Sequence, residues 1–393
     1  MKTNWKSPDI IIGKEATGKF YYRREVFENE VWKEIEKGNN VLLAAPRRVG
    51  KTSVMKYMTE NPKENYKLIF RNVQGIDDEK RFYKTIYELI IFCLSKFKKS
   101  KTLIQNYFTK MKISEITTSG IKIETKDIDY LGEINSLIPQ LDKDGENIIL
   151  LIDELPEVLH NLYLKDQKET ALNILKNLRH WRQEDGFRKI QFVLAGSIGI
   201  HYVVKTIAGR SSDINDLYKI TYQPLDESEV LDYISTVTKN ASVQYDEEKI
   251  LHIKNKIQYF VPYFINLMLD EIDKAAIKRN DPKITIEHID EAFNAIIKNN
   301  DNFSDWKKRL TDYLPKEDFS FINEILTHIS HKDQISIQNI YDIAVKHNKE
   351  TDYMDFIKDL EQDGYIVENS QSYTFISPFL KEYWKRNNPI HNA

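Results

Sequence analysis

The stretch "VLLAAPRRVGKTSVM", residues 41–55, joins an apolar run to a polar loop that ends in Gly50-Lys51-Thr52. It matches the phosphate-loop pattern G-x-x-x-x-G-K-[ST] at every defined position except the first, where Ala45 replaces glycine. Residues 41–44 are typical of a short buried strand, and residues 53–59 of the start of a helix. This order points the positive end of a helix dipole at the loop, where a phosphate group binds.

Each position of this loop has a chemical task if the loop binds phosphate. Lys51 reaches the β- and γ-phosphates, and Thr52 offers its hydroxyl to Mg²⁺. Gly50 stands where the backbone approaches phosphate most closely, because a Cβ there would obstruct the approach. Ala45 adds only a methyl group at the loop entrance. We therefore predict a nucleotide-binding segment made of Ala45, Pro46, Arg47, Arg48, Val49, Gly50, Lys51, Thr52 and Ser53.

A second motif supplies the carboxylates that such a loop needs. In "NIILLIDELPEV", residues 147–158, Ile148 to Ile152 form the continuous apolar run of a buried parallel strand. Asp153 and Glu154 follow at its carboxyl end, where open α/β sheets bind their ligands. We predict that Asp153 holds Mg²⁺ together with Thr52. Glu154 is the predicted catalytic base, which orients and deprotonates the attacking water.

Three further strands are expected, at residues 67–73, 190–194 and 218–222. Ser197 follows the second of them and is a candidate catalytic contact to the γ-phosphate or to the attacking water. Strands that alternate with helical segments favour a parallel sheet with helices on both faces. The predicted fold class is therefore α/β, a parallel-sheet P-loop NTPase core.

The motifs together resemble a known family, the archaeal-type P-loop ATPases related to STAND signalling ATPases and to AAA+ proteins. The resemblance rests on five segments in this order: "FYYRRE" (20–25), "APRRVGKTS" (45–53), "ILLIDELPEV" (149–158), "FVLAGSIG" (192–199) and "YQPLDESEV" (222–230). It implies ATP and Mg²⁺ as cofactors and a helical lid after the core. It also implies that Arg24 and Glu25 lie near the adenine.

The sequence departs from the family at two positions. Arg23 stands where the N-terminal Phe-x-Gly-Arg-Glu motif has glycine, and Phe260 stands at the glycine of the lid's Gly-x-Pro, whose proline is Pro262. Pro262 either lies near the adenine, as the resemblance implies, or simply starts a helix.

Three arginines keep more than one interpretation. Arg47 and Arg48 contact a phosphate, contact a neighbouring subunit, or lie on a solvated surface. Arg210, in "KTIAGRSSDIND" (205–216), is either an arginine finger that completes the site of a neighbouring subunit or a solvated loop residue. We favour the loop residue, while keeping Arg210 with Glu154 and Lys51 among the candidate catalytic groups.

Composition limits the alternatives. The chain has 393 residues, 30% of them charged, with a net charge of −3, so no overall basic field indicates nucleic acid. The single cysteine, Cys93, lies in the apolar run "IYELIIFCLSKF" and is expected in the core. That run is too short to cross a bilayer, and the N-terminus lacks a signal peptide's apolar stretch. These features favour a cytoplasmic protein that does not bind membranes.

A long insertion precedes the Asp153 strand. It holds the basic "KFKKSK" (96–101) and an alternating segment that we expect to form a hairpin from residues 112–117 and 121–126. The alternation predicts burial of Ile113, Ile121 and Ile123 against the core. The hairpin is either a contact element for a partner or for oligomerisation, or plain structural decoration.

The pattern changes after residue 297. "KNNDNFSDWKKRLTDYLPKED" (298–318) is expected to be a polar, turn-prone connector. Apolar periodicity at 319–329, 335–345 and 351–363, followed by a hairpin that turns at 368–371, predicts a winged-helix domain. Gly364 is the expected stop of its third helix. The predicted domains are an ATPase core at 1–224, a helical lid at 225–300, and linker plus winged helix at 301–393.

The third helix of this domain argues against DNA reading. Its stretch "ETDYMDFIKDLEQD" (350–363) holds a single base, Lys358, against six acids: Glu350, Asp352, Asp355, Asp359, Glu361 and Asp363. DNA affinity comes mostly from Lys and Arg that neutralise phosphates, so this helix would repel DNA. Only Lys381, Lys385 and Arg386 could contact the phosphate backbone of DNA.

Two functional hypotheses remain. We favour an ATP-binding and hydrolysing molecular switch of the STAND/AAA+ type that signals to a partner protein, with a homo-oligomer as the second assembly to test. The alternative is a DNA-associated ATPase that resembles archaeal replication initiators. A nucleotide-binding scaffold without turnover is disfavoured because Lys51, Thr52, Asp153 and Glu154 are all present.

Overall fold

The computed structural model describes residues 5–95, 113–117, 120–123, 128–140, 147–196, 200–209 and 212–390. The chain divides into two compact units. The sheet unit comprises Arg23–Ala45 and Lys51–Tyr222, and the helical unit comprises Met1–Tyr22, Pro46–Gly50 and Gln223–Ala393. Residues 46–50 of the phosphate loop thus belong to the helical unit, as do the N-terminal residues. The division into three domains at 224 and 300 stays a prediction.

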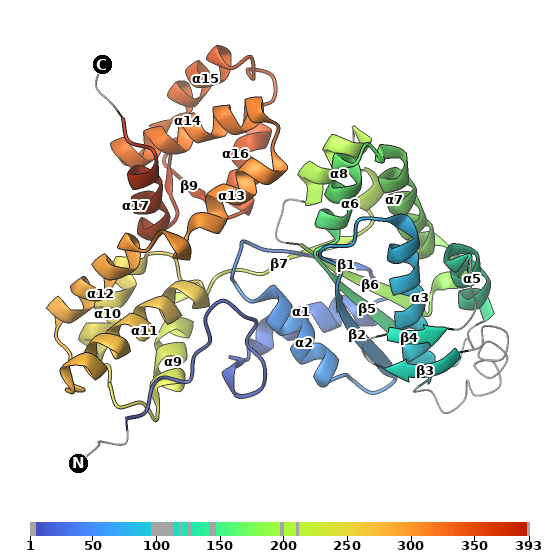
Figure 1. The fold of residues 1–393 in the computed structure, drawn as a ribbon, viewed down its shortest axis with the longest axis horizontal. Coiled ribbons are helices and arrows are strands. Elements are labelled where there is room, and N and C mark those ends of the chain that lie inside the picture. Colours follow the sequence, from blue (N-terminus) through green and yellow to red (C-terminus); the bar gives the residue numbers. More distant parts are fainter. Residues whose placement is uncertain are drawn as a thin grey trace. The chain divides into compact units, whose positions relative to one another are not determined.

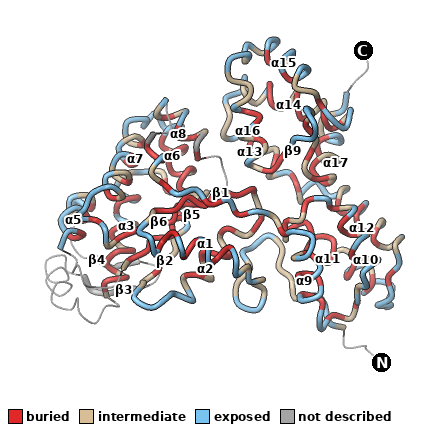
Figure 2. Tube along the Cα trace, turned by 180° about the vertical axis from the view of Figure 1, so that it is seen from behind, coloured by how far each residue is buried: buried red, intermediate tan, exposed pale blue. Residues whose placement is uncertain are grey.

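The sheet unit is built on five parallel strands in the order β2-β5-β6-β1-β7 (Figure 1). Their bounds are β1 (Val41–Ala44), β2 (Tyr66–Asn72), β5 (Asn147–Asp153), β6 (Ile190–Ala195) and β7 (Tyr218–Thr221). This confirms the predicted α/β fold class and the five predicted strands, with ends that differ by a residue or two. β5, β6 and β1 are the inner strands, where the apolar runs bury them on both faces (Figure 2).

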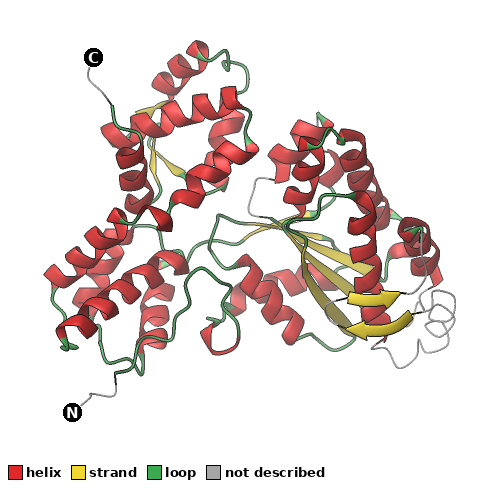
Figure 3. Ribbon diagram, viewed as in Figure 1, coloured by secondary structure: helices red, strands yellow, loops and turns green. Residues whose placement is uncertain are grey.

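Helices cover both faces of the sheet, with α1 and α2 on one side and α3, α6, α7 and α8 on the other (Figure 3). The helices of this unit are α1 (Glu25–Glu36), α2 (Lys51–Glu60), α3 (Glu79–Ser95), α5 (Tyr130–Leu137), α6 (Leu155–Leu164), α7 (Lys168–Gln183) and α8 (Ile200–Ala208), with 3-10 turns η2 (Ile138–Gln140), η3 (Asp185–Phe187) and η4 (Ser212–Ile214). α2 begins at Lys51, two residues before the expected helix start. Cys93 is 2% exposed, and burial raises the pKa of its thiol to about 12, which confirms its expected place in the core.

The expected hairpin in the insertion is present as β3 (Ile113–Thr117) and β4 (Gly120–Ile123), which pair antiparallel. Its side chains are not described, so the burial of Ile113, Ile121 and Ile123 stays a prediction. The basic segment 96–101 lies outside the described residues.

After residue 223 the helical unit continues with four helices. Their bounds are α9 (Glu227–Thr238), α10 (Glu247–Ile257), α11 (Pro262–Arg279) and α12 (Ile286–Lys298). Asp226 and Glu229 form a capping box that starts α9. The N-terminal segment, with the 3-10 turn η1 (Gly18–Phe20), is tied to α11 because Trp5 Nε1 donates to Asp273 Oδ1 at 3.0 Å and Asn266 Nδ2 donates to the Ile11 carbonyl at 3.0 Å.

The prediction of a polar, turn-prone connector at residues 298–318 is wrong. Residues 300–302 form the 3-10 turn η5 (Asn300–Asn302), and α13 (Ser304–Tyr313) follows at once. Phe303 and Trp306 are fully buried and Leu310 is 8% exposed. Their spacing places these three apolar side chains on one face, although the segment between them is rich in Lys and Asp. The helix forms because this narrow stripe packs into the helical unit.

The C-terminal elements follow the predicted order of helices and hairpin. They are α14 (Lys316–Lys332), β8 (Ile335–Ser336), α15 (Ile337–Lys346), α16 (Tyr353–Gln362), β9 (Ile366–Asn369), β10 (Ser372–Phe375) and α17 (Pro378–Asn387). The strands form a sheet in the order β8-β10-β9. Ser370 and Gln371 turn the hairpin with φ of 46° and 71°, as a two-residue type I′ loop requires. Gly364, at φ 77°, ends α16 as expected. The assignment as a winged-helix domain stays a prediction.

A substitution of Trp306 tests whether α13 packs as described. Its ring stacks on Phe264 at 6.2 Å between centroids and meets Tyr365 edge-on at 5.3 Å. We expect Trp306→Ala to lower the free energy of unfolding by about 3–5 kcal/mol, because it leaves a large cavity. Lys308→Ala, on the exposed side of α13, should change it by no more than about 0.5 kcal/mol. Urea unfolding followed by circular dichroism measures both, and equal midpoints would show that α13 does not pack as described.

Candidate functional site

The carboxyl ends of three neighbouring strands define the site. β6 lies between β1 and β5, and the registers pair Leu43 with Ala195 and Ile152 with Leu194. Because the strands are parallel and in register, the loops that leave them emerge at one edge of the sheet. The phosphate loop, the Asp153-Glu154 pair and Gly196 therefore follow adjacent strands.

The backbone φ angles of the phosphate loop alternate in sign. Arg48 has φ 62° and Gly50 has φ 109°, while Val49 between them is not in the positive-φ region. Alternation of this kind turns consecutive N–H groups to one side and makes an anion-binding nest. Ala45 is not in the left-handed region either, so nothing in its backbone requires the glycine of the motif. The substitution is compatible with a formed loop.

Lys51 is the first residue of α2 and is 6% exposed. Its Nζ donates to the Ala45 carbonyl at 2.8 Å, which places the ammonium group across the base of the loop. A phosphate oxygen is a charged acceptor and can replace this neutral carbonyl. Ser53 follows in the same turn and is also buried.

Thr52 and Asp153 meet although they are far apart in the sequence. Thr52 Oγ1 donates to Asp153 Oδ2 at 2.6 Å, and the Glu154 N–H donates to Asp153 Oδ1 at 3.1 Å. Asp153 is 1% exposed, and burial raises the pKa of its carboxyl above the usual range; the charge of Glu154 adds to this, while Thr52 and Lys51 oppose it. A hydroxyl and a carboxylate are the hard oxygen ligands that suit Mg²⁺, so the pair fits the predicted metal site.

Glu154 has an unusual backbone. It precedes α6 with φ 62° and ψ 32°, in the left-handed region that non-glycine residues rarely adopt. Pro156 in the first turn of α6 packs on Gly196, where an added Cβ would lie 2.5 Å from the proline ring. Strained residues that packing holds in place are common at functional sites. No propensity in the sequence indicates this conformation.

Residues 13–313 match the family model for an AAA-like domain. The chain belongs to this family. No curated protein matches it. Among solved structures, a Walker-type ATPase of Pyrococcus abyssi is similar at 16% identity and a TM-score of 0.60, over 94% of this chain and 98% of that one. The ORC2 protein of Aeropyrum pernix is similar at 12% identity and a TM-score of 0.50, over 92% of each chain. At these identities the similarity shows the fold, that of a P-loop NTPase.

Arg47 and Arg48 of the AAA-like domain are not solvated surface residues, which corrects one of the three interpretations. Their side chains are 24% and 21% exposed, and both contact Asp305 Oδ2, at 3.4 and 3.1 Å. The Arg48 guanidinium also lies over the Tyr263 ring at 4.0 Å from its centroid. Burial, and then the charges of Arg309 and Arg48, lower the pKa of Arg47. Sequence reasoning missed Asp305 because it took the segment around it for a linker.

The other predicted residues of the AAA-like domain are more dispersed. Arg24 precedes α1 and lies over the Tyr222 ring at 4.9 Å, and Glu25 is the first residue of α1. Pro262 starts α11, as the simpler interpretation expected. The adenine contacts of these three residues stay predictions. Ser197 and Arg210 lie outside the described residues, so their roles stay predictions too.

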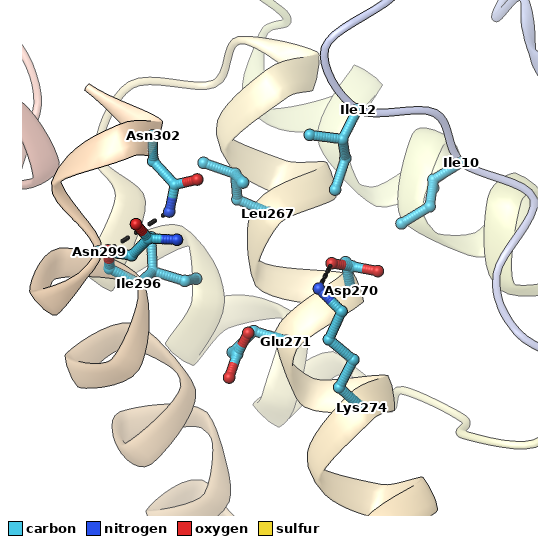
Figure 4. Close-up of a pocket in the computed structure, with 9 residues that line it drawn as sticks. All are labelled: Ile10, Ile12, Leu267, Asp270, Glu271, Lys274, Ile296, Asn299 and Asn302. Carbon is cyan, nitrogen blue, oxygen red and sulfur yellow. Dashed lines mark hydrogen bonds and ion pairs between the residues drawn. The ribbon is translucent and has the colours of Figure 1, made fainter. Parts of the chain in front are cut away.

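A cavity of about 340 Å³ lies in the helical unit and contains none of the predicted site residues (Figure 4). Its polar side chains are used within the chain: Asp270 pairs with Lys274 at 2.5 Å, and Asn302 donates to the Ile296 carbonyl at 3.4 Å. We do not place the site there. Among the described residues no cluster of His, Cys, Asp and Glu is arranged for a metal, and no helix is long and apolar enough to cross a membrane.

Asp153→Asn should raise the stability of the nucleotide-free chain, although it removes a predicted metal ligand. The raised pKa of Asp153 means that the folded chain binds this proton more tightly than the unfolded chain, so the ionised carboxylate lowers stability at neutral pH. We expect the neutral amide to raise the melting temperature without nucleotide by about 2–4 °C, a typical shift for 1 kcal/mol. Thermal melts at pH 7 measure this. Asp185→Asn, at an exposed position, is the control, and a lower melting temperature for Asp153→Asn alone would contradict the argument.

Proposed function

We propose that this AAA-like protein is a Mg²⁺-dependent ATPase that works as a molecular switch read by a partner protein. The observation that carries the proposal is the 2.6 Å hydrogen bond from Thr52 to Asp153, which brings the two predicted metal ligands together beside a buried Lys51. The similar ORC2 protein of Aeropyrum pernix has been solved with ADPNP and ADP, which supports adenine nucleotides as the ligands.

The residues of this chain divide the chemistry among them. The N–H groups of residues 48–51 and the Lys51 ammonium bind the phosphates, and Thr52 and Asp153 would hold Mg²⁺. Bound there, the metal neutralises charge on the phosphate oxygens. Glu154 orients a water and takes its proton as the water oxygen attacks the γ-phosphorus. The bond to the bridging oxygen breaks with its electron pair, which leaves ADP and inorganic phosphate.

The switch part of the proposal starts from the contacts of the loop within the helical unit. Pro46–Gly50 belong to this unit, and both Arg47 and Arg48 contact Asp305 in α13. A ligand that engages the loop would therefore act on α13. We expect the nucleotide state to change this contact and thereby the surface that the helical unit offers to a partner.

DNA is a less suitable partner for this chain. α16 carries Asp355, Asp359 and Glu361 against a single base, Lys358. A surface of this sign repels phosphates, so we retain the protein partner.

Lys51→Ala should abolish nucleotide binding. The substitution removes charged hydrogen bonds to two phosphates, each worth about 1.5–3 kcal/mol, so we expect at least about 100-fold weaker affinity. Equilibrium titration with a fluorescent ATP analogue measures it, with Lys63→Ala as an exposed control. Near wild-type affinity in Lys51→Ala would remove the phosphate-binding assignment.

Glu154→Gln should separate binding from chemistry. Glutamine keeps the size of the side chain but loses the base, so Mg-ATP binding should persist while turnover falls by about 10²–10⁴-fold. Phosphate release at saturating ATP measures the effect. Glu157→Gln, in the first turn of α6, should keep its turnover. If Glu154→Gln also keeps its turnover, the base lies elsewhere.

A further inference from the structure

Arg48 adopts a backbone conformation that its own chemistry disfavours. Its φ of 62° lies in the left-handed region, where the Cβ of an L-residue meets the neighbouring carbonyl oxygen. Glycine, and less often Asn or Asp, takes this conformation readily, but arginine does not. Some other contact must therefore hold Arg48 in place.

The Arg48 side chain supplies that contact. Its Nη2 donates to Asp305 Oδ2 at 3.1 Å, and its guanidinium lies 4.0 Å from the centroid of the Tyr263 ring. Both partners lie in helices of the same unit. Tyr263 is 8% exposed and its hydroxyl donates to the Asn302 carbonyl at 3.1 Å, while Asp305 precedes the fully buried Trp306 in α13.

We propose that Asp305 and Tyr263 are positioning residues for the phosphate loop. By holding the Arg48 guanidinium they keep its backbone left-handed, so that the nest of N–H groups at residues 48–51 is formed before a nucleotide arrives. If Arg48 relaxed to a right-handed conformation, the alternation with Gly50 would be lost and the N–H groups would diverge. The inference rests on the proposed nucleotide binding and adds how the binding loop is held.

The effect of removing Asp305 on nucleotide affinity separates positioning from two other roles, a direct contact of Arg48 with the γ-phosphate and competition of Asp305 with phosphate. A guanidinium that touched the γ-phosphate would affect ATP more than ADP, whereas the loop N–H groups cradle the α- and β-phosphates that both nucleotides carry. An Asp305 that competed with phosphate for Arg47 and Arg48 would weaken binding when present. Positioning predicts that removing Asp305 weakens ADP and ATP alike and leaves kcat at saturating ATP unchanged.

The decisive experiment compares two substitutions of Arg48. Alanine loses the side-chain contacts but keeps the Cβ, so we expect about 5- to 30-fold weaker binding of fluorescent ADP and ATP analogues. Glycine loses the same contacts but adopts positive φ freely, so Arg48→Gly should bind about tenfold more tightly than Arg48→Ala. Asp305→Ala should weaken binding in the wild-type chain and have a smaller effect in the Arg48→Gly chain, where only its contact with Arg47 remains to be lost. Lys308→Ala, on the exposed side of α13, is the control.

Three results would overturn the inference: equal affinities for Arg48→Gly and Arg48→Ala, tighter binding in Asp305→Ala, and wild-type affinity in Asp305→Ala. The Arg48 pair decides the matter even if Asp305→Ala fails to fold, which a thermal melt reveals. The wild-type chain and Lys51→Ala are titrated in parallel. If the wild type binds no nucleotide, the proposed function fails; if it binds and the Arg48 pair is equal, only the positioning role fails.

Discussion

A carboxylate buried at the end of a central strand is the constraint on which this site depends. Asp153 is 1% exposed, so its charge has lost nearly all contact with water, and burial raises the pKa of its carboxyl. The Thr52 hydroxyl and the Glu154 N–H offset part of that cost. The Thr52 hydrogen bond depends on the register of β5 in the sheet, because a slip by one residue would turn Asp153 to the other face. A divalent cation would satisfy the same carboxylate more fully.

Two residues of the candidate site have a strained backbone. Arg48 lies in the loop after β1 and Glu154 directly follows β5, and both are in the left-handed region with the same φ of 62°. Neither residue type favours this conformation, so the surroundings must hold it. For Glu154 the following α6 packs through Pro156 on Gly196, and for Arg48 the partners are Asp305 and Tyr263. The loops are therefore shaped by packing in two units and not by their local sequence alone.

The sequence predicted what short-range patterns determine. Apolar runs predicted the inner strands β1, β5 and β6 because a parallel sheet buries both of its faces, and Gly50-Lys51-Thr52 located the loop because the spacing itself carries the chemistry. It did not predict the hand of Arg48, which depends on residues more than two hundred positions away. The sequence also failed to predict α13. Phe303 and Trp306 stand among charged residues, and this polar composition concealed their helical spacing. Ser197 and Arg210 remain predictions that the described residues do not test.

Fold similarity alone leaves the output of this protein open, since the same core serves many activities. In this chain a series of contacts runs from the phosphate loop into the core of the helical unit. Arg48 contacts Asp305, and the next residue, Trp306, packs against Phe264 and Tyr365. If a nucleotide binds the loop as proposed, a change in the loop backbone acts on this contact, because the Arg48 guanidinium is held against Asp305 and over the Tyr263 ring. The proposed reader of that state is a protein, since the acidic α16 would repel the phosphates of DNA.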